Sequence, residues 1–223
     1  MARSRPLDQV FLQLFGPESD EEVECGVYVF KSLNRVLDSR SIIRHPTVTG
    51  LTLCKAWVSK DFQASVLAAV AAEGWFEGHG MSTNQAMRFG GLPEWAVQLA
   101  ALLPVQQAFP AEIASRQPLF DQLIANSYQP GEGIKAHIDL LRFADGICIA
   151  SFCSPAIMHF TRDGCQRQSL LLEPGDVLLL CGEARYAWEH GIDSCQEDVW
   201  QSRKIKRARR MSVTLRKLLP QHA

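Results

Sequence analysis

The hydrophobic pattern of this chain changes its period after Pro118, and this change limits the folds open to it. From there on, apolar residues alternate over short runs, and turn residues such as 162–164 and 173–176 separate several of the runs. A period of two is typical of β-strands, and many short strands with regular turns indicate a sandwich or barrel. The predicted strands are residues 119–128, 134–140, 146–152, 156–160, 168–172, 177–181 and 209–218.

Two helical patterns precede these strands. A strand at residues 51–57 leads to Ser59, a suitable N-cap for a helix that Gly74 would end, and Pro93 starts a second helix. The faces expected to be buried are Phe62, Val66, Val70, Trp95, Leu99 and Leu102. The predicted fold is therefore α+β with a mainly β core, a jelly roll buttressed by N-terminal helices.

The chain has 223 residues, of which 47% are hydrophobic, and this composition suits one packed domain. Residues 47–220 are expected to form that domain. Residues 1–46 form a weakly patterned N-terminal extension, in which apolar residues between Leu7 and Leu14 recur at helical spacing and predict a short amphipathic helix.

Charge and cysteine usage restrict the setting in which the chain works. The formal net charge is −1, but residues 199–220 hold eight Lys or Arg and no acid. This basic edge fits a polyanion partner and a solvated strand end equally well. The seven cysteines form no CxxC pair and indicate reduced thiols. With neither a signal peptide nor a membrane-spanning run, we expect a cytoplasmic or nuclear protein with no membrane partner. The sequence gives no evidence for an obligate oligomer.

A His-x-Asp pair provides the first chemical signal. His137 and Asp139 would share one face of a strand, which is the arrangement for two ligands of one metal. Two imidazoles and one carboxylate are the ligand set of a non-haem Fe(II) oxygenase. His190 and His159 compete for the third place, and a lone His on an apolar strand, like His159, is more often a core or surface residue.

The final strand places Arg210, Ser212, Thr214 and Arg216 on one face. That face either meets solvent, as in a half-exposed strand, or points into the barrel. In the second case two buried arginines need anions, and a dicarboxylic acid fits a pair of guanidinium groups. Asn126 and Tyr128 also share a face, either as a polar pair at a strand end or as part of this pocket.

These blocks together resemble the AlkB group of Fe(II)/2-oxoglutarate-dependent dioxygenases over residues 49–219. The resemblance rests on Asn-x-Tyr-x-Pro-Gly-x-x-Ile-x-x-His-x-Asp from residue 126, His-Gly-Ile from residue 190, and Arg-x5-Arg from residue 210. It implies a double-stranded β-helix that uses Fe(II), O2 and the co-substrate 2-oxoglutarate. The implied iron ligands are His137, Asp139 and His190, and the implied co-substrate residues are Asn126, Tyr128, Arg210 and Arg216.

Residues 185–192 are most similar to the branch that hydroxylates the wobble uridine of tRNA. The resemblance implies hydroxylation or oxidative demethylation of a modified nucleobase, with RNA as the expected partner. The residues expected to contact the base are Trp75, Phe76, Arg88, Phe89 and Arg185. The residues expected to contact phosphates of the nucleic acid are Arg203, Lys204, Lys206, Arg207 and Arg209. The alternatives are that Trp75 and Phe76 are core residues, and that the chain is a protein or small-molecule hydroxylase or a non-catalytic binding module.

Overall fold

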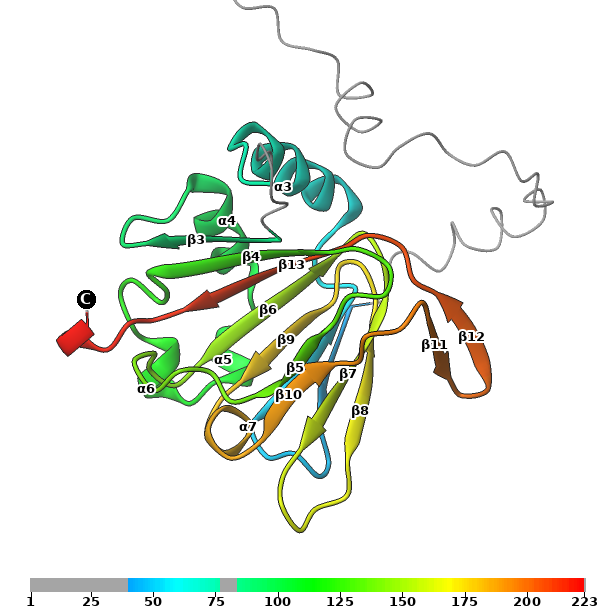
Figure 1. The fold of residues 1–223 in the computed structure, drawn as a ribbon. Helices are drawn as coiled ribbons and strands as arrows, with labels where there is room; N and C mark the ends of the chain where they lie inside the picture. The colour runs from blue at the N-terminus through cyan, green and yellow to red at the C-terminus, as the bar shows by residue number, and fades with distance from the viewer. Residues whose placement is uncertain (1–39, 77–83, 223) are drawn as a thin grey trace, which may run out of the picture.

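Two antiparallel sheets pack face to face in the computed structural model, which describes residues 40–76 and 84–222 (Figure 1). The major sheet has seven strands in the order β1-β2-β9-β6-β13-β4-β3. Their bounds are β1 Ser41–Arg44, β2 Leu51–Lys55, β9 Val177–Leu180, β6 Ile147–Phe152, β13 Arg210–Arg216, β4 Gln122–Tyr128 and β3 Gln85–Phe89.

The minor sheet has four strands in the order β5-β10-β7-β8. Their bounds are β5 Ile134–His137, β10 Glu189–Ile192, β7 Ala156–Thr161 and β8 Gln168–Leu172. A separate two-stranded hairpin, β11 Glu197–Trp200 with β12 Arg203–Lys206, projects from one side of the molecule (Figure 1). Every strand pair in the three sheets is antiparallel, as a jelly roll requires.

The helices gather on the outer face of the major sheet (Figure 1). The main ones are α3 Lys60–Ala72 and α4 Glu94–Leu102, followed by the single turns α5 Val105–Ala108 and α6 Ala111–Ala114. A further turn, α7 Glu183–Tyr186, links β9 to β10, and a 3₁₀ turn covers Pro220–His222. Within the described ranges, no helix has the length and apolarity to cross a membrane.

Strand alternation divides the apolar residues of the major sheet between two cores. Ala150, Val177 and Val213 pack under the helices, whereas Ile149 and Leu178 pack against the minor sheet. Because both faces of the major sheet are covered, its strands are apolar nearly throughout. The exception is the inner face of β13 and β4, where polar residues occupy buried positions, and this departure marks the site.

The predicted architecture is confirmed, because a jelly-roll-like pair of sheets is buttressed by helices on one side. The Ser59 N-cap is also confirmed, since its side chain accepts the Phe62 amide at 3.3 Å. Two details differ: Pro93 is the N-cap of α4, and Leu102 is exposed at the end of that helix. The major sheet also begins at β1, before the expected boundary at residue 46, and the helix expected near Leu7–Leu14 lies outside the described residues.

Candidate active site

The polar side of β13 faces the space between the two sheets. Arg210, Ser212, Thr214 and Arg216 line one pocket there, whereas the three residues between them belong to the core beneath the helices. The face meets the pocket because the helices cover the opposite side of the sheet and β13 is an interior strand, paired with β4 and β6. Of the two orientations that the sequence allowed, the structure has the inward one.

Strand β4 adds Asn126 and Tyr128 to the lining of the same pocket. The antiparallel register places Tyr128 beside Arg210 and Asn126 beside Ser212, and all four residues line the pocket. Gln85 of β3 extends this row, since its Nε2 donates to Oδ1 of Asn126 at 2.8 Å. Sequence reasoning missed Gln85, because only the pairing of β3 with β4 brings it opposite Asn126.

Two of the three metal-ligand candidates lie on the minor sheet, and the third, Asp139, lies in the loop after β5. His190 on β10 lies directly opposite His137 on β5, and their ring centroids are 4.6 Å apart. Nε2 of His190 lies 3.6 Å from Oδ2 of Asp139, and ligand atoms of all three residues lie within 4.8 Å of one another. Buried Oδ2 of Asp139 has no hydrogen-bond partner in the protein. This donor set could hold Fe(II), because two imidazoles and a carboxylate on one side leave other coordination positions open.

Neighbouring groups orient two of these side chains. Nδ1 of His137 lies 2.9 Å from the carbonyl oxygen of Lys135, and a carbonyl can only accept, so the ring donates there and leaves Nε2 free for a metal. Nη2 of Arg216 lies 2.5 Å from Oδ1 of Asp139. This ion pair occupies one carboxylate oxygen, which leaves Oδ2 as the atom that faces the two imidazoles.

Burial sets the protonation state of His190. Its pKa falls from the ordinary value of 6.5 to about 4, chiefly because burial disfavours the imidazolium, and the nearby charge of Asp139 only partly opposes this effect. The ring is therefore neutral near pH 7. Neutral imidazole is the form that binds a metal, so His190 needs to release no proton when it acts as a ligand.

We expect the metal-free protein to lose stability as the pH falls from 6.5 toward 4. The folded-state pKa of His190 is lowered, so the unfolded chain binds more protons in this window and acid favours unfolding. At 1.36 kcal/mol per pKa unit, the contribution of His190 approaches about 3 kcal/mol at the acid end. Urea unfolding with a chelator present, compared between the wild type and His190→Gln, measures this difference, and equal pH slopes would contradict it.

Arg210 is a buried cation that has no carboxylate within salt-bridge distance among the described residues. Its Nη2 donates to Oγ of Ser151 at 3.0 Å, its guanidinium lies 5.7 Å from the ring centroid of Tyr128, and its Nε has no partner. Burial lowers the pKa of Arg210. A buried guanidinium without an anion is costly, and a carboxylate of 2-oxoglutarate would supply that anion through paired hydrogen bonds.

A comparison with protein-family models matches residues 88–216 to the 2OG-Fe(II) oxygenase superfamily. The matched range contains the three ligand candidates, Arg210 and Arg216. This chain is an AlkB-like member of that superfamily. Its dioxygenases use Fe(II), 2-oxoglutarate and O2, so the predicted family and cofactors are confirmed.

Curated relatives and a solved structure agree with this family. The "Alkylated DNA repair protein ALKBH8 homolog" of Arabidopsis thaliana is 31% identical over 77% of this chain and 59% of its own length. The mouse "tRNA (carboxymethyluridine(34)-5-O)-methyltransferase ALKBH8" is 39% identical over 37% of this chain and 12% of its own length. The structure of OsALKBH1 has a TM-score of 0.54 at 17% identity, covers 79% of this chain and 100% of its own, and supports the fold. The AlkB-like chain thus spans under two thirds of these curated relatives.

Arg185 does not lie where the sequence placed it. This arginine of the AlkB-like chain was expected to contact substrate, but it is 2% exposed and its guanidinium donates to backbone carbonyls of the loop that carries Asp139. Within α7, a helix of one turn, periodicity cannot show which way a side chain points. The substrate contact predicted for Arg185 is therefore wrong in this structure.

The substrate residues expected before the β core divide into two groups. Trp75 and Phe76 pack against the core beneath the helices, as their alternative interpretation held, and the ring of Trp75 lies 6.0 Å from that of Trp95. Arg88 is paired with Glu73 at 2.7 Å and covers Trp75 on the same outer side of β3. Phe89 alone remains an exposed aromatic on the side of β3 that faces the pocket.

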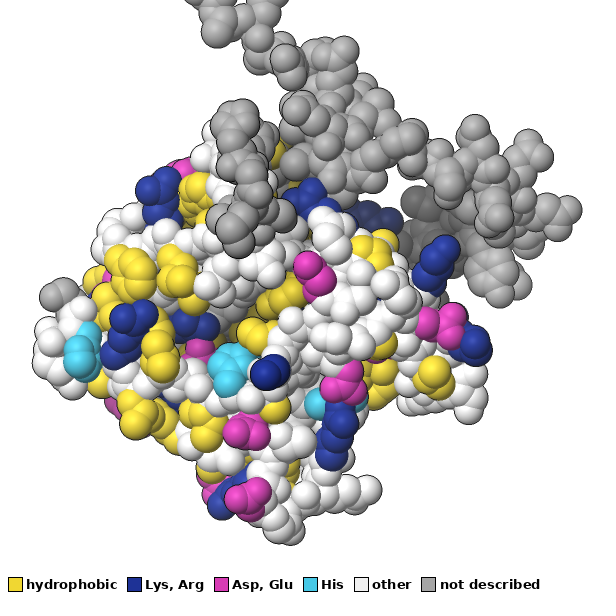
Figure 2. Space-filling model, in the orientation of Figure 1, with side chains coloured by type: hydrophobic (Ala, Val, Ile, Leu, Met, Phe, Trp, Pro, Cys, Tyr) yellow, Lys and Arg dark blue, Asp and Glu magenta, His cyan; other side chains and the backbone are white. Residues whose placement is uncertain are grey.

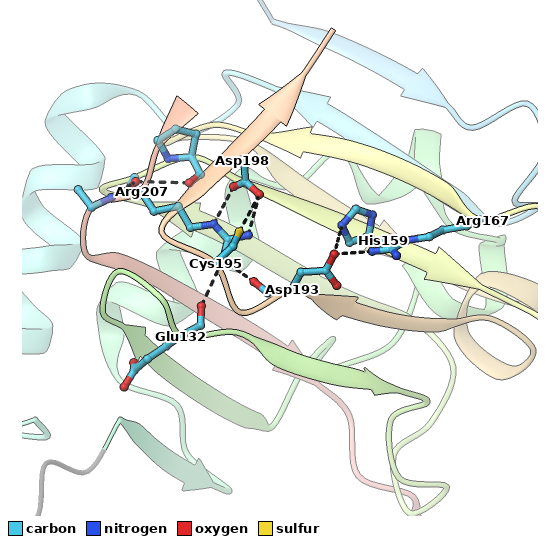
Figure 3. A network of polar contacts seen from close by, with 10 residues as sticks. Glu132, His159, Arg167, Asp193, Cys195, Asp198 and Arg207 are labelled. Atoms are coloured by element: carbon cyan, nitrogen blue, oxygen red, sulfur yellow. Dashed lines mark hydrogen bonds and ion pairs between the residues drawn. The ribbon is translucent and has the colours of Figure 1, made fainter. Parts of the chain in front are cut away.

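Arg207 was expected to contact phosphates, and the structure contradicts this. Arg207 is buried and paired with Asp198 at 2.7 Å, and it also donates to the carbonyls of Glu132 and Asp193 (Figure 3). The side chain therefore ties the β11–β12 hairpin to both strands of the ligand-bearing pair, at the end where β5 begins and β10 ends. Arg209 donates to Oγ of Ser127, whereas Arg203, Lys204 and Lys206 are exposed and remain candidates for phosphate contacts.

His159 lies away from the site, on the outer side of the minor sheet. Its Nδ1 lies 2.8 Å from Oγ of Ser169, and its Nε2 lies 3.2 Å from Asp193, which also binds Arg167 (Figure 3). Both ring nitrogens are engaged in this network, so the preference for His190 over His159 agrees with the geometry.

Exposed apolar side chains surround the approach to the pocket. Met87 and Phe89 of β3 are 47% and 48% exposed, and Leu140 and Leu141 in the loop after β5 are 59% and 73% exposed. Arg142 joins the two groups, because its guanidinium lies 5.6 Å from the ring centroid of Phe89. Figure 2 shows hydrophobic and basic side chains gathered on this part of the face.

Proposed function

We propose that the chain is an Fe(II)- and 2-oxoglutarate-dependent dioxygenase that hydroxylates or oxidatively demethylates a modified nucleobase in RNA, with tRNA as the first candidate. One observation carries the chemical part of the proposal. The buried cation of Arg210, which lacks an anion, lines one pocket with His137, His190 and Arg216, and Arg216 pairs with Asp139, whose other carboxylate oxygen has no partner. The proposed iron ligands are His137, Asp139 and His190, and the proposed co-substrate residues are Asn126, Tyr128, Arg210 and Arg216.

In this scheme the protein binds and orients the reactants and excludes water. When bound, Fe(II) supplies the chemistry that uses O2 and 2-oxoglutarate to insert oxygen into a substrate C–H bond, with succinate and CO2 as the co-products. Arg210 would hold one carboxylate of 2-oxoglutarate, and the ring of Tyr128 lies beside its guanidinium. Arg216 orients the Asp139 carboxylate, and the strand pair β5–β10 keeps the two imidazoles adjacent.

The position of Phe89 supports a nucleobase as the substrate. The register of β13, β4 and β3 places Arg216, Gln122 and Phe89 in one row, so Phe89 lies two strands, about 10 Å, from the residue that holds Asp139. An exposed ring with a guanidinium beside it provides a stacking platform for a base drawn out of its stack. The names of two relatives, which refer to alkylated DNA and to tRNA, support nucleic acid as the substrate class.

Incubation with Fe(II), 2-oxoglutarate and total tRNA tests the proposal, with succinate release and mass spectrometry of the nucleosides as readouts. We expect RNA to raise succinate release and to yield nucleosides that have gained an oxygen atom or lost a methyl group. His137→Ala should reduce both readouts to background. Equal succinate release with and without RNA, together with unchanged nucleosides, would falsify the RNA assignment while leaving the oxygenase assignment intact.

Phe89→Ala should weaken RNA-stimulated turnover without removing RNA-independent turnover of 2-oxoglutarate. Loss of one base-stacking contact is worth about 1–3 kcal/mol, which corresponds to roughly 5- to 150-fold. Val97→Ala is the matched control, because Val97 is equally exposed, at 48%, but lies on α4 across the sheet. Equal effects of the two substitutions on the Michaelis constant for RNA would remove Phe89 from the proposed site.

A hydroxylase of a protein side chain or a small apolar molecule is the second candidate. The exposure of Leu140 and Leu141 beside the pocket favours it, because two neighbouring leucines provide no attraction for a phosphate backbone. RNA binding that does not weaken as salt rises, combined with turnover stimulated by a peptide or an apolar small molecule, would favour this candidate.

A further inference from the structure

The loop that carries Asp139 closes around a single buried guanidinium. Nη1 of Arg185 donates to the carbonyl of Asp139 at 3.0 Å, and its Nη2 donates to the carbonyls of Leu140 and Phe143 at 2.8 and 3.0 Å. Arg185 is 2% exposed and makes no ion pair within 4.0 Å among the described residues. Loop carbonyls usually bond to water, so a charged side chain that collects three of them fixes the path of this loop.

One of the three carbonyls belongs to Asp139 itself. Arg216 fixes the Asp139 carboxylate at 2.5 Å, and Arg185 fixes the backbone of the same residue from another direction. Two arginines therefore hold one residue, Arg185 by its backbone carbonyl and Arg216 by its carboxylate. With its backbone and one oxygen held, Asp139 has little freedom to turn Oδ2 away from the imidazoles.

The segment that carries Arg185 is itself anchored at several points. The amide of Gly182, at the start of α7, donates to both carboxylate oxygens of Asp145 at 3.0 and 3.1 Å. The amide of Ala184 donates to the carbonyl of Thr49 at 2.9 Å. Arg185 thus extends from a well-anchored turn into the loop 139–143, and the same chain segment continues directly into β10 and His190.

From this geometry we infer that Arg185 is a positioning residue for the metal site, which holds the backbone of Asp139 so that its carboxylate faces His137 and His190. Arg185 does not line the pocket and makes no hydrogen bond to the other two ligand candidates, so it acts on the metal through Asp139. The inference rests on the proposed assignment of Asp139 as an iron ligand. It goes further by assigning control of metal affinity to a residue outside the ligand set.

Metal affinity measured on the purified full chain tests the inference. We expect Arg185→Ala to bind Co(II) about 10- to 100-fold more weakly than the wild type, the usual range for partners that orient a ligand. Arg185→Lys keeps the charge but not the planar guanidinium, so its Co(II) affinity should lie between those of the wild type and Arg185→Ala. The d–d absorption of bound Co(II) reports the coordination geometry and should differ between Arg185→Ala and the wild type.

Two controls separate positioning from general loss of stability. Leu99→Ala removes a fully buried side chain on α4, costs about 2–5 kcal/mol of stability, and should leave Co(II) affinity unchanged. Low millimolar guanidinium should restore part of the affinity of Arg185→Ala, because the ion can enter the vacated space, and should not affect Leu99→Ala. Unchanged affinity in Arg185→Ala, or equal losses in Arg185→Ala and Leu99→Ala, would overturn the inference.

The outcome also distinguishes the inference from the proposal beneath it. If the wild type and His137→Ala bind Co(II) equally weakly, the metal-site assignment fails and the role of Arg185 fails with it. If the wild type binds tightly, His137→Ala does not, and Arg185→Ala matches the wild type, the metal site stands and only the role of Arg185 is lost.

Discussion

Replacing Arg210 with methionine is expected to raise the melting temperature of the metal-free protein and to abolish its response to 2-oxoglutarate. The guanidinium is 4% exposed, has no carboxylate partner among the described residues, and leaves Nε without a hydrogen bond. Burying a charge under these conditions costs stability, which an apolar side chain of similar length would recover. The gain should fall in the range of about 1–4 kcal/mol seen when buried charged groups are replaced by well-packed apolar ones.

Thermal unfolding with and without 2-oxoglutarate measures both halves of this prediction. For a domain of this size, each kcal/mol shifts the melting temperature by about 2–4 °C. The wild type should gain stability from Mn(II) with 2-oxoglutarate, as any ligand of the folded state provides, whereas Arg210→Met should gain only what Mn(II) alone gives. The control is Arg203→Met on the exposed strand β12, which should change neither quantity. A lower melting temperature for Arg210→Met, or a preserved response to 2-oxoglutarate, would show that Arg210 serves the fold and not the co-substrate.

Local patterns in the sequence predicted the parts of the site that lie along single strands. Alternation in β13 placed Arg210 and Arg216 on one face, and the His137-x-Asp139 spacing placed two ligand candidates together. The first succeeds because a strand's period of two depends only on the strand. Asp139, in contrast, lies in the loop after β5, so its position beside His137 depends on the path of that loop. The same reasoning located most of the core strands, since turn residues separate them, but not β10, which carries His190.

Contacts between distant segments were not predictable in this way. Arg207 belongs to a basic run, but its partner Asp198 is brought to it by the β11–β12 hairpin, which the sequence did not reveal. Arg185 stands inside a motif, yet its direction is set by the loop 139–143 that folds over it. In both cases an arginine that looked available to a substrate binds groups of the protein itself, because a buried charge needs polar partners.

The ion pair of Asp139 with Arg216 is expected to couple the fold to the proposed metal site more strongly than any other pair at the pocket. The Asp139 side chain is buried, at 3% exposure, the Arg216 side chain is 11% exposed, and 2.5 Å separates Oδ1 from Nη2. Removing one member of a buried pair costs about 3–5 kcal/mol, because the remaining charge is left without a partner. Asp139→Ala should therefore unfold at lower urea concentration even when a chelator has removed all metal, and its turnover of 2-oxoglutarate should fall to background.

A double-mutant cycle separates the two roles of Asp139. In the metal-free state, Asp139→Ala combined with Arg216→Met should recover much of the stability lost in Asp139→Ala, since no unpaired charge remains. The same double variant should recover no turnover and no Co(II) binding, because the ligand is still missing. Stability losses that simply add would contradict the coupling and would mean that Arg216 finds another anion in the pocket. Recovery of stability without recovery of metal binding would show that the orientation of the ligand depends on an ion pair that the fold needs in any case.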